Sequence, residues 1–195
     1  MISRIRAALY LLAVSTVSAH LALAQEEIST APLTSVERYA LDPSREMLDH
    51  GRNVAETACA SCHGIDGVGT EPGVPNLAGQ RIVYLYRVLQ GYQERERHND
   101  TMNHAVGFLN EEALLAVAAW YASLPPARSE PTTALETDVD LGGGDPFAGL
   151  RDAMKKCVRC HGEDGNASAS GMPNLTGQSV EYFVHSMQAY AGGDR

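Results

Sequence analysis

The residues best suited to chemistry lie in two short segments with one pattern, residues 59–63 (Cys-Ala-Ser-Cys-His) and residues 157–161 (Cys-Val-Arg-Cys-His). All four cysteines of the 195-residue chain belong to these segments. The Cys-x-x-Cys-His pattern is typical of an attachment site for a c-type haem. Its two thiols can form thioethers with the two vinyl groups of one haem, and the adjacent imidazole can ligate the iron. The sequence therefore predicts two covalently attached haem c groups.

The role of each residue follows from its order in the segment. The histidine beside the second cysteine is the expected proximal iron ligand, His63 in the first segment and His161 in the second. The first cysteine and the histidine are four residues apart, so they would share one face of a helix. The expected thioether residues are Cys59, Cys62, Cys157 and Cys160.

Two other uses of these cysteines stay open from the sequence. Zinc binds cysteine and histidine, although adjacent Cys and His are awkward ligands for one tetrahedral ion and neither segment has a clear fourth donor. A disulfide within each pair is the other alternative in an oxidising compartment. The intact mass of the exported protein would distinguish both from covalent haem.

A Pro-Asn-Leu triplet follows each haem segment at the same distance. A histidine that ligates a metal usually donates its other ring N–H to an acceptor that fixes the ring. We expect the carbonyls of Pro75 and Pro173 to be these acceptors, and Leu77 and Leu175 to pack against the haems. An ordinary turn is the alternative interpretation of the triplets.

A second axial ligand is expected at each iron, because a buried electron-transfer iron has both axial positions filled. In the first copy the candidate is Met102, within the polar segment 99–103, which we expect to be a loop. Methionine opposite histidine raises the reduction potential and suits an electron carrier. His98 and His104 flank Met102 and are the competing ligands, although both fit ordinary surface histidines.

No distal ligand is assigned to the second iron. The counterpart of Met102 would fall beyond residue 195. Met187 and His185 align with positions inside a helix, and Met172 precedes Pro173 in the loop expected on the proximal side.

The similarity of the two halves extends well beyond the cysteines, at a constant offset of 98 residues from Cys59 to Cys157. The chain is therefore two copies of one domain. By the same offset Arg195 aligns with Arg97, so we expect the second copy to lack its C-terminal part and the sequence to be a fragment. The other positions that recur without a gap include Gly51, Gly64, Gly67, Pro75, Asn76, Leu77, Gly79, Gln80, Tyr84 and Tyr92.

The first domain is expected at residues 44–126 and to contain three helices. Asp42 as N-cap and Pro43 as first helical residue predict a helix over about 43–57, with apolar positions at Met47, Leu48, Val54 and Ala58. A second helix is predicted over about 81–94, where apolar residues recur with helical spacing. These apolar residues are Ile82, Leu85, Leu89 and Tyr92.

The third helix should begin after Asn110, a good N-cap residue, with Glu111 and Glu112 in its first turn. Pro125-Pro126 should end it. Its apolar stripe consists of Leu114, Val117, Ala118 and Tyr121.

The N-terminus has the pattern of an export signal: two arginines, a short apolar run and Ala-Leu-Ala at residues 22–24. We expect a signal peptide over residues 1–24, removed on export to the periplasm, with an uncleaved anchor as the alternative. Residues 127–145, rich in Pro, Thr, Gly and acidic residues, are expected to be a linker. The Asp145-Pro146 pair repeats Asp42-Pro43 and should open the second domain, residues 146–195.

The chain is acidic, with a formal charge of −9, and loss of the two arginines in residues 1–24 would lower it by two, to −11. This charge argues against a nucleic-acid partner. It favours a redox partner with a basic docking surface. No stretch after the signal is apolar enough to span a membrane.

These motifs resemble those of class I cytochrome c domains: Cys-x-x-Cys-His-Gly, Pro-Asn-Leu-x-Gly-Gln, Met102, and a last helix ending at residues 120–125 (Trp-Tyr-Ala-Ser-Leu-Pro). The tandem arrangement resembles the dihaem cytochromes of the "c-four" type, and the haem subunit of flavocytochrome c sulfide dehydrogenase is similar. The resemblance covers about residues 44–126 and 146–195. It implies an all-α fold of two tandem domains and His/Met coordination at each iron.

The function expected from these features is one-electron transfer between respiratory partners, without catalysis by the chain itself. The alternative is a haem-bearing subunit of a dehydrogenase complex of the flavocytochrome c sulfide dehydrogenase kind. A peroxidase-like enzyme is a third alternative, weakened because no distal His/Arg pair is placed to activate peroxide.

Overall fold

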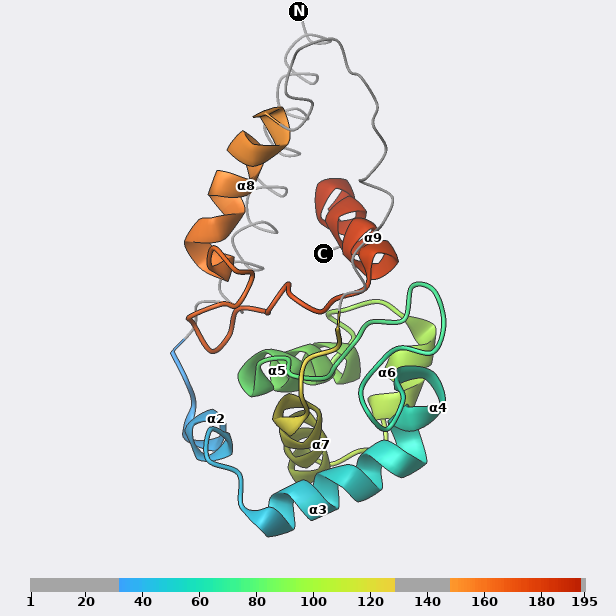
Figure 1. The fold of residues 1–195 in the computed structure, drawn as a ribbon. Helices are drawn as coiled ribbons and strands as arrows, with labels where there is room; N and C mark the ends of the chain where they lie inside the picture. Colours follow the sequence, from blue (N-terminus) through green and yellow to red (C-terminus); the bar gives the residue numbers. More distant parts are fainter. Residues whose placement is uncertain (1–31, 129–147, 194–195) are drawn as a thin grey trace, which may run out of the picture.

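The computed structural model of the chain describes residues 32–128 and 148–193, and within these ranges it contains helices and no strands. The two copies of the domain are called the first and second repeat below. In the first repeat α3, α5 and α7 pack together, and the short helices α2, α4 and α6 lie around them (Figure 1). Their bounds are α2 Ser35–Ala40, α3 Arg45–Val54, α4 Ala60–His63, α5 Ile82–Gln93, α6 Asp100–Val106 and α7 Glu111–Ser123. The second repeat contributes α8 Ala148–His161 and α9 Val180–Gly192.

The first repeat is built on α7, which is apolar on nearly every side. Eight of its residues are buried, among them the four predicted for its stripe. Asn110 caps it as predicted, since its side-chain oxygen accepts a hydrogen bond from the Ala113 backbone N–H at 2.9 Å. The predicted second helix is also confirmed, as α5 begins and ends within one residue of the expected bounds.

Helix α3 crosses α7 very closely at Gly51. A Cβ atom at this position would lie 2.0 Å from the carbonyl oxygen of Ala116, so only glycine permits this approach. Ala55, one turn later, is fully buried. The recurring glycine before each haem segment thus has a packing reason in the first repeat.

The start and end predicted for the first helix were wrong. The helix begins at Arg45 with Ser44 as its N-cap, because the Ser44 hydroxyl oxygen accepts a hydrogen bond from the Met47 backbone N–H at 3.1 Å. It does not end near Thr57 but continues through a π-helical turn, Ala55–Cys59, into α4.

Two short helices were not predicted. Helix α2 is held by a capping box, in which the Thr34 hydroxyl and the Glu37 carboxylate each bind the other's backbone N–H. Helix α6 contains Met102, so the expectation of a loop there was wrong. Asn99 caps α6 by accepting a hydrogen bond from the Met102 backbone N–H at 3.0 Å.

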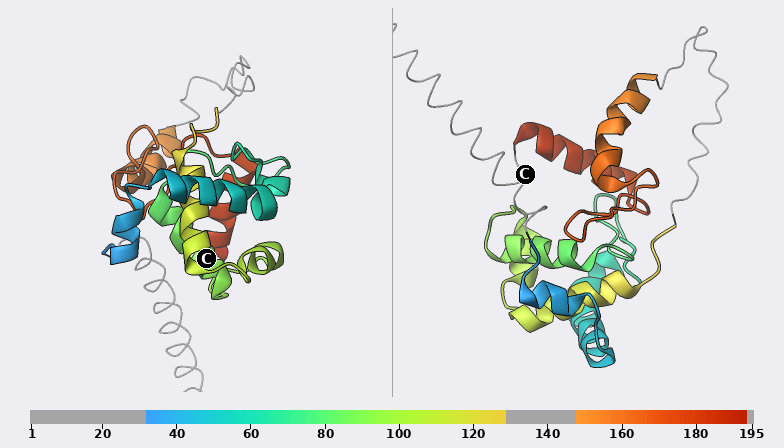
Figure 2. Two further views of the ribbon diagram at one scale, coloured as in Figure 1. Left: turned by 90° about the horizontal axis from the view of Figure 1, so that it is seen from below. Right: turned by 90° about the vertical axis from the view of Figure 1, so that its left-hand side faces the viewer.

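The second repeat lies at the opposite end of the molecule from α3 (Figures 1 and 2). Its loop between α8 and α9 faces the first repeat. The expected signal peptide, most of the expected linker and the Asp145-Pro146 pair lie outside the described residues. None of the described helices is both long and apolar enough to cross a bilayer.

Candidate functional site

Both Cys-x-x-Cys-His segments lie at the C-terminal end of a helix, immediately before a sharp turn. In the first repeat the chain leaves α4 through Gly64, which has a φ of +69°, and in the second it leaves α8 through Gly162, with a φ of +77°. A positive φ of this size favours glycine. Each histidine is thus the last residue of a helix and is followed at once by the loop that returns over it.

Each histidine meets the carbonyl predicted from the sequence. The Nδ1 of His63 lies 3.1 Å from the Pro75 carbonyl oxygen, and the Nδ1 of His161 lies 2.9 Å from that of Pro173. A carbonyl only accepts hydrogen bonds, so Nδ1 must carry the proton and Nε2 keeps its lone pair. This tautomer leaves Nε2 able to ligate a metal.

Burial also favours neutral histidine in the first repeat. His63 is 7% exposed, and this burial lowers its pKa despite the opposing effect of the Pro75 carbonyl. The imidazole is therefore neutral at physiological pH, as a metal ligand must be.

The geometry gives no support to the two alternative uses of the cysteines. No disulfide joins any of the four, all of which lie within the described ranges. Burial raises the pKa of an unattached Cys59 thiol to about 11. Across residues 32–128 and 148–193 no three His, Cys, Asp or Glu side chains form a group suited to a metal ion, so the geometry gives the zinc alternative no ligand set.

The loops after the two segments share most of their backbone hydrogen bonds. We call residues 64–81 the first loop and residues 162–179 the second loop. In the first loop the Gly67 carbonyl accepts from the Leu77 N–H at 2.8 Å, and in the second the Gly165 carbonyl accepts from the Leu175 N–H at 2.7 Å. These bonds bring each Pro-Asn-Leu triplet back beside its histidine.

Two arginines in the first repeat carry buried donors that fit an anionic group. The Nε of Arg81 and both Nε and Nη2 of Arg97 are buried without a hydrogen-bond partner. Buried donors are almost always satisfied in folded proteins. The two carboxylates of a haem are acceptors of the required charge, so these residues fit that group.

Met102 is half-buried on α6 and packs against the core of the first repeat, as does Leu77. The neighbouring His98 and His104 are exposed. Of the second-repeat candidates, Met187 and His185 lie on α9 as expected, and Met172 lies in the second loop.

Comparison with known proteins agrees with this geometry. The family described as Cytochrome c matches residues 48–125. The thiosulfate dehydrogenase electron acceptor of Stutzerimonas stutzeri is 32% identical over 172 residues, covering 85% of this chain and 77% of that protein. Cytochrome c4 of Thiocapsa roseopersicina is 30% identical over 149 residues, covering 74% and 75%.

The chain belongs to the cytochrome c family. It is of the cytochrome c4 type, with an all-α fold of two tandem class I cytochrome c domains, and it is a haem-based electron carrier. Members of this family carry covalently attached haem c.

Solved structures support the same fold. Reduced cytochrome c4 from Pseudomonas stutzeri matches with a TM-score of 0.60 and 26% identity, covering 76% of this chain and 82% of that one. The thiosulfate dehydrogenase TsdBA from Marichromatium purpuratum matches with a TM-score of 0.59 and 30% identity over 76% of this chain. The match spans only 34% of the TsdBA chain, about a third of its length.

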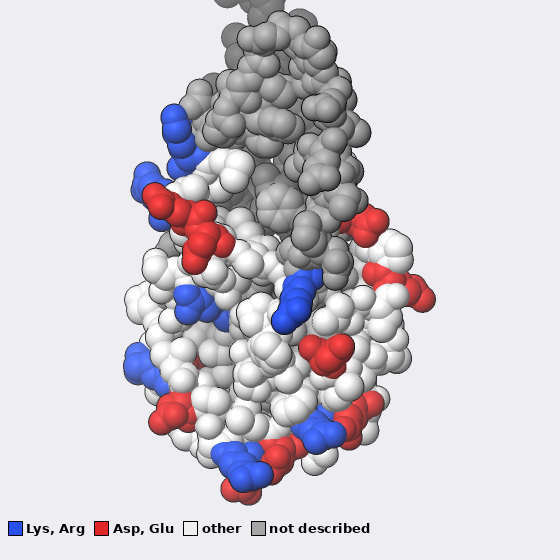
Figure 3. Space-filling view, viewed as in Figure 1, with Lys and Arg blue, Asp and Glu red and all other residues white. Residues whose placement is uncertain are grey.

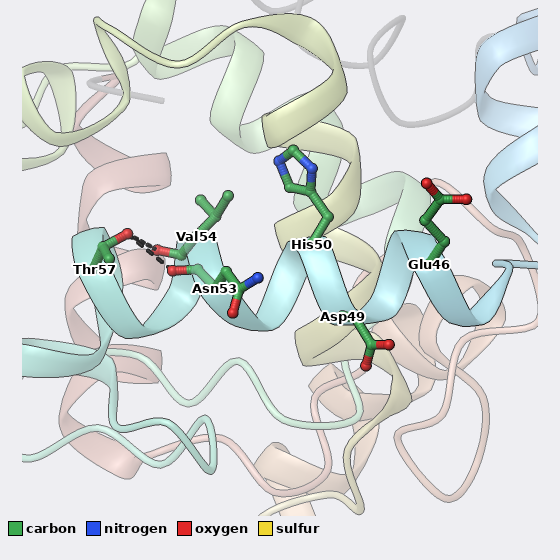
Figure 4. Close-up of a pocket in the computed structure, with 6 residues that line it drawn as sticks. All are labelled: Glu46, Asp49, His50, Asn53, Val54 and Thr57. Carbon is green, nitrogen blue, oxygen red and sulfur yellow. Dashed lines mark hydrogen bonds between the residues drawn. The ribbon is translucent and has the colours of Figure 1, made fainter.

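A shallow hollow elsewhere on this cytochrome c chain is lined from one helix and the turn after it (Figure 4). Its carboxylates are exposed to solvent, and its Thr57 hydroxyl bonds back to the Asn53 and Val54 carbonyls. These are the features of a solvated helix face rather than of a site. The lining residues are Glu46, Asp49, His50, Asn53, Val54 and Thr57.

Sequence reasoning missed the amide side chains of the two loops and the two arginines. Asn76, Gln80, Asn174 and Gln178 hydrogen-bond across the two repeats. Their signal was present, because the Asn and Gln recur at the same spacing in both copies. Only the Pro and Leu of that pattern were given a role.

Proposed function

We propose that the chain is a periplasmic one-electron carrier that binds two covalent haems, one on each Cys-x-x-Cys-His segment. The observation that carries this proposal is the pair of matching histidine–carbonyl hydrogen bonds, 3.1 Å at His63 and 2.9 Å at His161. Each leaves one imidazole nitrogen available beside two thiols. The bound haem would supply the change between ferric and ferrous iron.

The residues of each segment then have distinct tasks. Cys59 and Cys62 would hold the first haem as thioethers, and His63 would ligate its iron. Met102 would be the second ligand of that iron, and Arg81 and Arg97 would offer donors to the haem carboxylates.

The second haem would be held in the same way by Cys157 and Cys160, with His161 as an iron ligand. Pro75 and Pro173 fix the orientation of the two histidines, and Leu77 and Leu175 would cover the haems. The chain itself performs no substrate chemistry. Its part would be to hold the two haems and to supply ligands to their irons.

The domain organisation proposed with this function is a signal peptide at 1–24, a first domain at 44–126, a linker at 127–145 and a second domain at 146–195. Export through the signal would place the protein in the periplasm. Its formal charge, −9 for the full sequence and −11 after loss of the two arginines in residues 1–24, suits a redox partner with a basic docking surface. On the face shown in Figure 3, charges of both signs are interspersed rather than gathered into one patch.

A second candidate function is the electron-accepting subunit of a dehydrogenase. Two similar proteins bear names that favour it, the thiosulfate dehydrogenase electron acceptor and the thiosulfate dehydrogenase TsdBA. The two candidates differ in partner and not in cofactor chemistry. Stable co-purification with a dehydrogenase, and reduction of the haems only in its presence, would favour the subunit.

The intact mass of the exported protein tests the two-haem proposal. We expect a mass that exceeds the polypeptide from residue 25 onward by two haems. The Cys59→Ala/Cys62→Ala and Cys157→Ala/Cys160→Ala double variants should each retain one haem. A wild-type mass without two covalent haems would overturn the proposal.

A further inference from the structure

The two repeats meet through amide groups that pair reciprocally. The backbone N–H of Asn76 donates to Oε1 of Gln178 at 2.9 Å, and the backbone N–H of Asn174 donates to Oε1 of Gln80 at 2.7 Å. Each glutamine also donates through Nε2 to the carbonyl of the asparagine that it faces, at 3.0 Å for Gln178 and 2.9 Å for Gln80. The contact therefore has approximate twofold symmetry.

Each of these backbone N–H groups belongs to a peptide that also serves a proximal histidine. The Pro75–Asn76 peptide accepts from His63 at its carbonyl and donates to Gln178 at its N–H. Histidine, peptide and glutamine thus form one continuous chain of hydrogen bonds. This series of hydrogen bonds starts in the first repeat and ends in the second.

The second repeat contains the equivalent arrangement. The Pro173–Asn174 peptide lies 2.9 Å from His161 Nδ1 at its carbonyl and 2.7 Å from Gln80 Oε1 at its nitrogen. Each proximal histidine is therefore connected, through a single peptide group, to a glutamine of the other repeat.

Both glutamines are fixed in orientation. Oε1 of Gln80 also accepts from the Arg81 N–H at 2.9 Å, and Oε1 of Gln178 accepts from the Ser179 N–H at 2.8 Å. Gln80 is only 8% exposed. With two N–H donors aimed at it in each case, the oxygen cannot exchange places with the amide nitrogen without losing every bond.

We propose that Gln178 and Gln80 are positioning residues, each of which sets the hydrogen-bond strength at the proximal histidine of the opposite repeat. The inference rests on the proposed function, since it concerns the potentials of the two haems. Hydrogen bonds in a chain polarise one another. A glutamine oxygen that accepts from the peptide N–H makes the carbonyl of that peptide a better acceptor.

The sign of the effect follows from this polarisation. A stronger carbonyl acceptor gives the histidine more imidazolate character and raises its basicity as a ligand. A more basic ligand stabilises ferric over ferrous iron, which lowers the reduction potential. Removal of the glutamine oxygen should therefore raise the potential of the haem in the other repeat.

The test compares Gln178→Met with Gln80→Met in the full chain carrying both haems. Methionine has a similar length and provides neither the acceptor nor the donor. NMR-monitored redox titration follows the hyperfine-shifted ring signals of each proximal histidine separately. At a fixed applied potential, we expect Gln178→Met to raise the ferrous-to-ferric ratio of the His63 haem about threefold, or roughly 30 mV at about 59 mV per tenfold change for one electron.

The two variants are matched controls for one another. Each removes the same set of bonds from the contact, so general loosening would shift both haems alike. A crossed pattern, with Gln178→Met acting on the His63 haem and Gln80→Met on the His161 haem, supports the proposal. Equal shifts of both haems, or shifts confined to the substituted repeat, overturn it.

A charged variant keeps the test decisive if the methionine variants are not exported as folded protein. Gln178→Glu retains an oxygen for the Asn76 N–H and strengthens it as an acceptor, so the His63 haem should shift to a lower potential and its Nδ1–H signal should move. An unchanged Nδ1–H signal would overturn the proposal. If the mass shows two haems but the potentials show no crossed shift, only this inference is wrong. If the mass does not show two haems, the proposed function is wrong as well.

Discussion

The two repeats share their loops but differ in how their helices are buried. The hydrogen bonds that fold each loop agree closely, such as 2.8 Å from Leu77 to Gly67 and 2.7 Å from Leu175 to Gly165. Helix α5, in contrast, has five buried residues, whereas its counterpart α9 has none. The exposed apolar residues of α9 are Val180, Phe183, Val184, Met187 and Tyr190.

This difference shows that the loops and the helices are stabilised by different contacts. Both loops are held by their own turns and by the reciprocal amide contact. The first loop is also bonded to α7, where the Gly79 N–H donates to the Tyr121 carbonyl at 3.0 Å and the Tyr121 hydroxyl donates to the Gly64 carbonyl at 3.1 Å. The burial of α5 comes largely from α7, against which it packs. The turns around each proximal histidine are therefore encoded locally and twice, while the helical core of the first repeat depends on long-range packing.

The helices that carry the cysteines differ too. In the first repeat a π-helical turn, Ala55–Cys59, interrupts the helix just before the motif, whereas α8 continues as a regular helix through His161. A π-helical turn inside a helix often accompanies a functional site. Here it follows the tight crossing of α3 over α7, a constraint that the described part of the second repeat does not share.

The largest effect is expected from Met102→Ala, which removes the proposed distal ligand of the first haem. The iron–thioether absorption band of that haem should disappear, and any residual band would belong to the second haem. Met47→Ala is the matched control, because Met47 also packs against the core of the first repeat. Survival of the full band in Met102→Ala would show that another residue ligates the first iron.

Gly51→Ala tests whether the first repeat depends on the α3–α7 crossing. The added Cβ would lie 2.0 Å from a backbone oxygen, which cannot move aside cheaply. We expect the free energy of unfolding to fall by about 3 kcal/mol in chemical denaturation. Gly91→Ala is the control, since its Cβ would meet only the Arg97 side chain at 3.4 Å. That change should be stabilising by up to about 1 kcal/mol. Equal losses in both variants would contradict the role assigned to the crossing.

Glu37→Gln removes the ion pair between Glu37 and Arg87. His185 stands at the position of Arg87 in the second repeat. The pair is well buried, with side chains 3% and 10% exposed. We expect a loss of about 2 kcal/mol in unfolding free energy, measured at neutral pH. Glu56→Gln breaks the exposed pair with Arg52 and should cost less than about 0.5 kcal/mol.

The same pair should make stability depend on pH. Burial alone would raise the pKa of Glu37, but hydrogen bonds from Arg87 and Thr34 and the charge of Arg87 lower it below its usual value. A lowered pKa in the folded state means that the stabilisation is complete above the ordinary glutamate range and is lost as the pH falls through the folded value. Glu37→Gln should flatten this part of the acid-unfolding curve, and an unchanged curve would exclude Glu37 as its cause.

The smallest effect is expected from Tyr121→Phe. The buried hydroxyl donates to the Gly64 carbonyl at 3.1 Å, so α7 is tied to the residue directly after His63. Its loss should cost about 1 kcal/mol in thermal or chemical unfolding. Tyr39→Phe, at a side chain that is 62% exposed, should be neutral. If the Tyr121→Phe protein is as stable as the wild type, the hydrogen bond from Tyr121 to Gly64 does not stabilise the fold.

The features predicted correctly from the sequence depend on short stretches of chain. Helix α7 has a good N-cap, an apolar stripe and a terminating proline within 17 residues, from Asn110 to Pro126. The Pro75 carbonyl was found because a rigid turn recurs at a fixed distance from each histidine. These are signals that periodicity and spacing contain.

The features that were missed depend on choices between local alternatives or on tertiary structure. Asp42 and Ser44 are both acceptable caps, and only the position of the Met47 N–H decides between them. Helix α6 is too short and polar to show periodicity. The pairing of Asn76 with Gln178 joins residues far apart in sequence, and no single-repeat pattern specifies which amide faces which.

The reciprocal contact between the loops has a consequence for how the sequence can change. Its donors and acceptors are self-complementary, so one surface design serves both halves of the duplicated chain. The contact divides into two pairings, Asn76 with Gln178 and Asn174 with Gln80, that share no side chain. In each pairing the glutamine side chain bonds to the backbone N–H and C=O of the facing asparagine. The constraint on side-chain identity in these pairings therefore falls on the two glutamines, and either one can change without removing the bonds that the other makes.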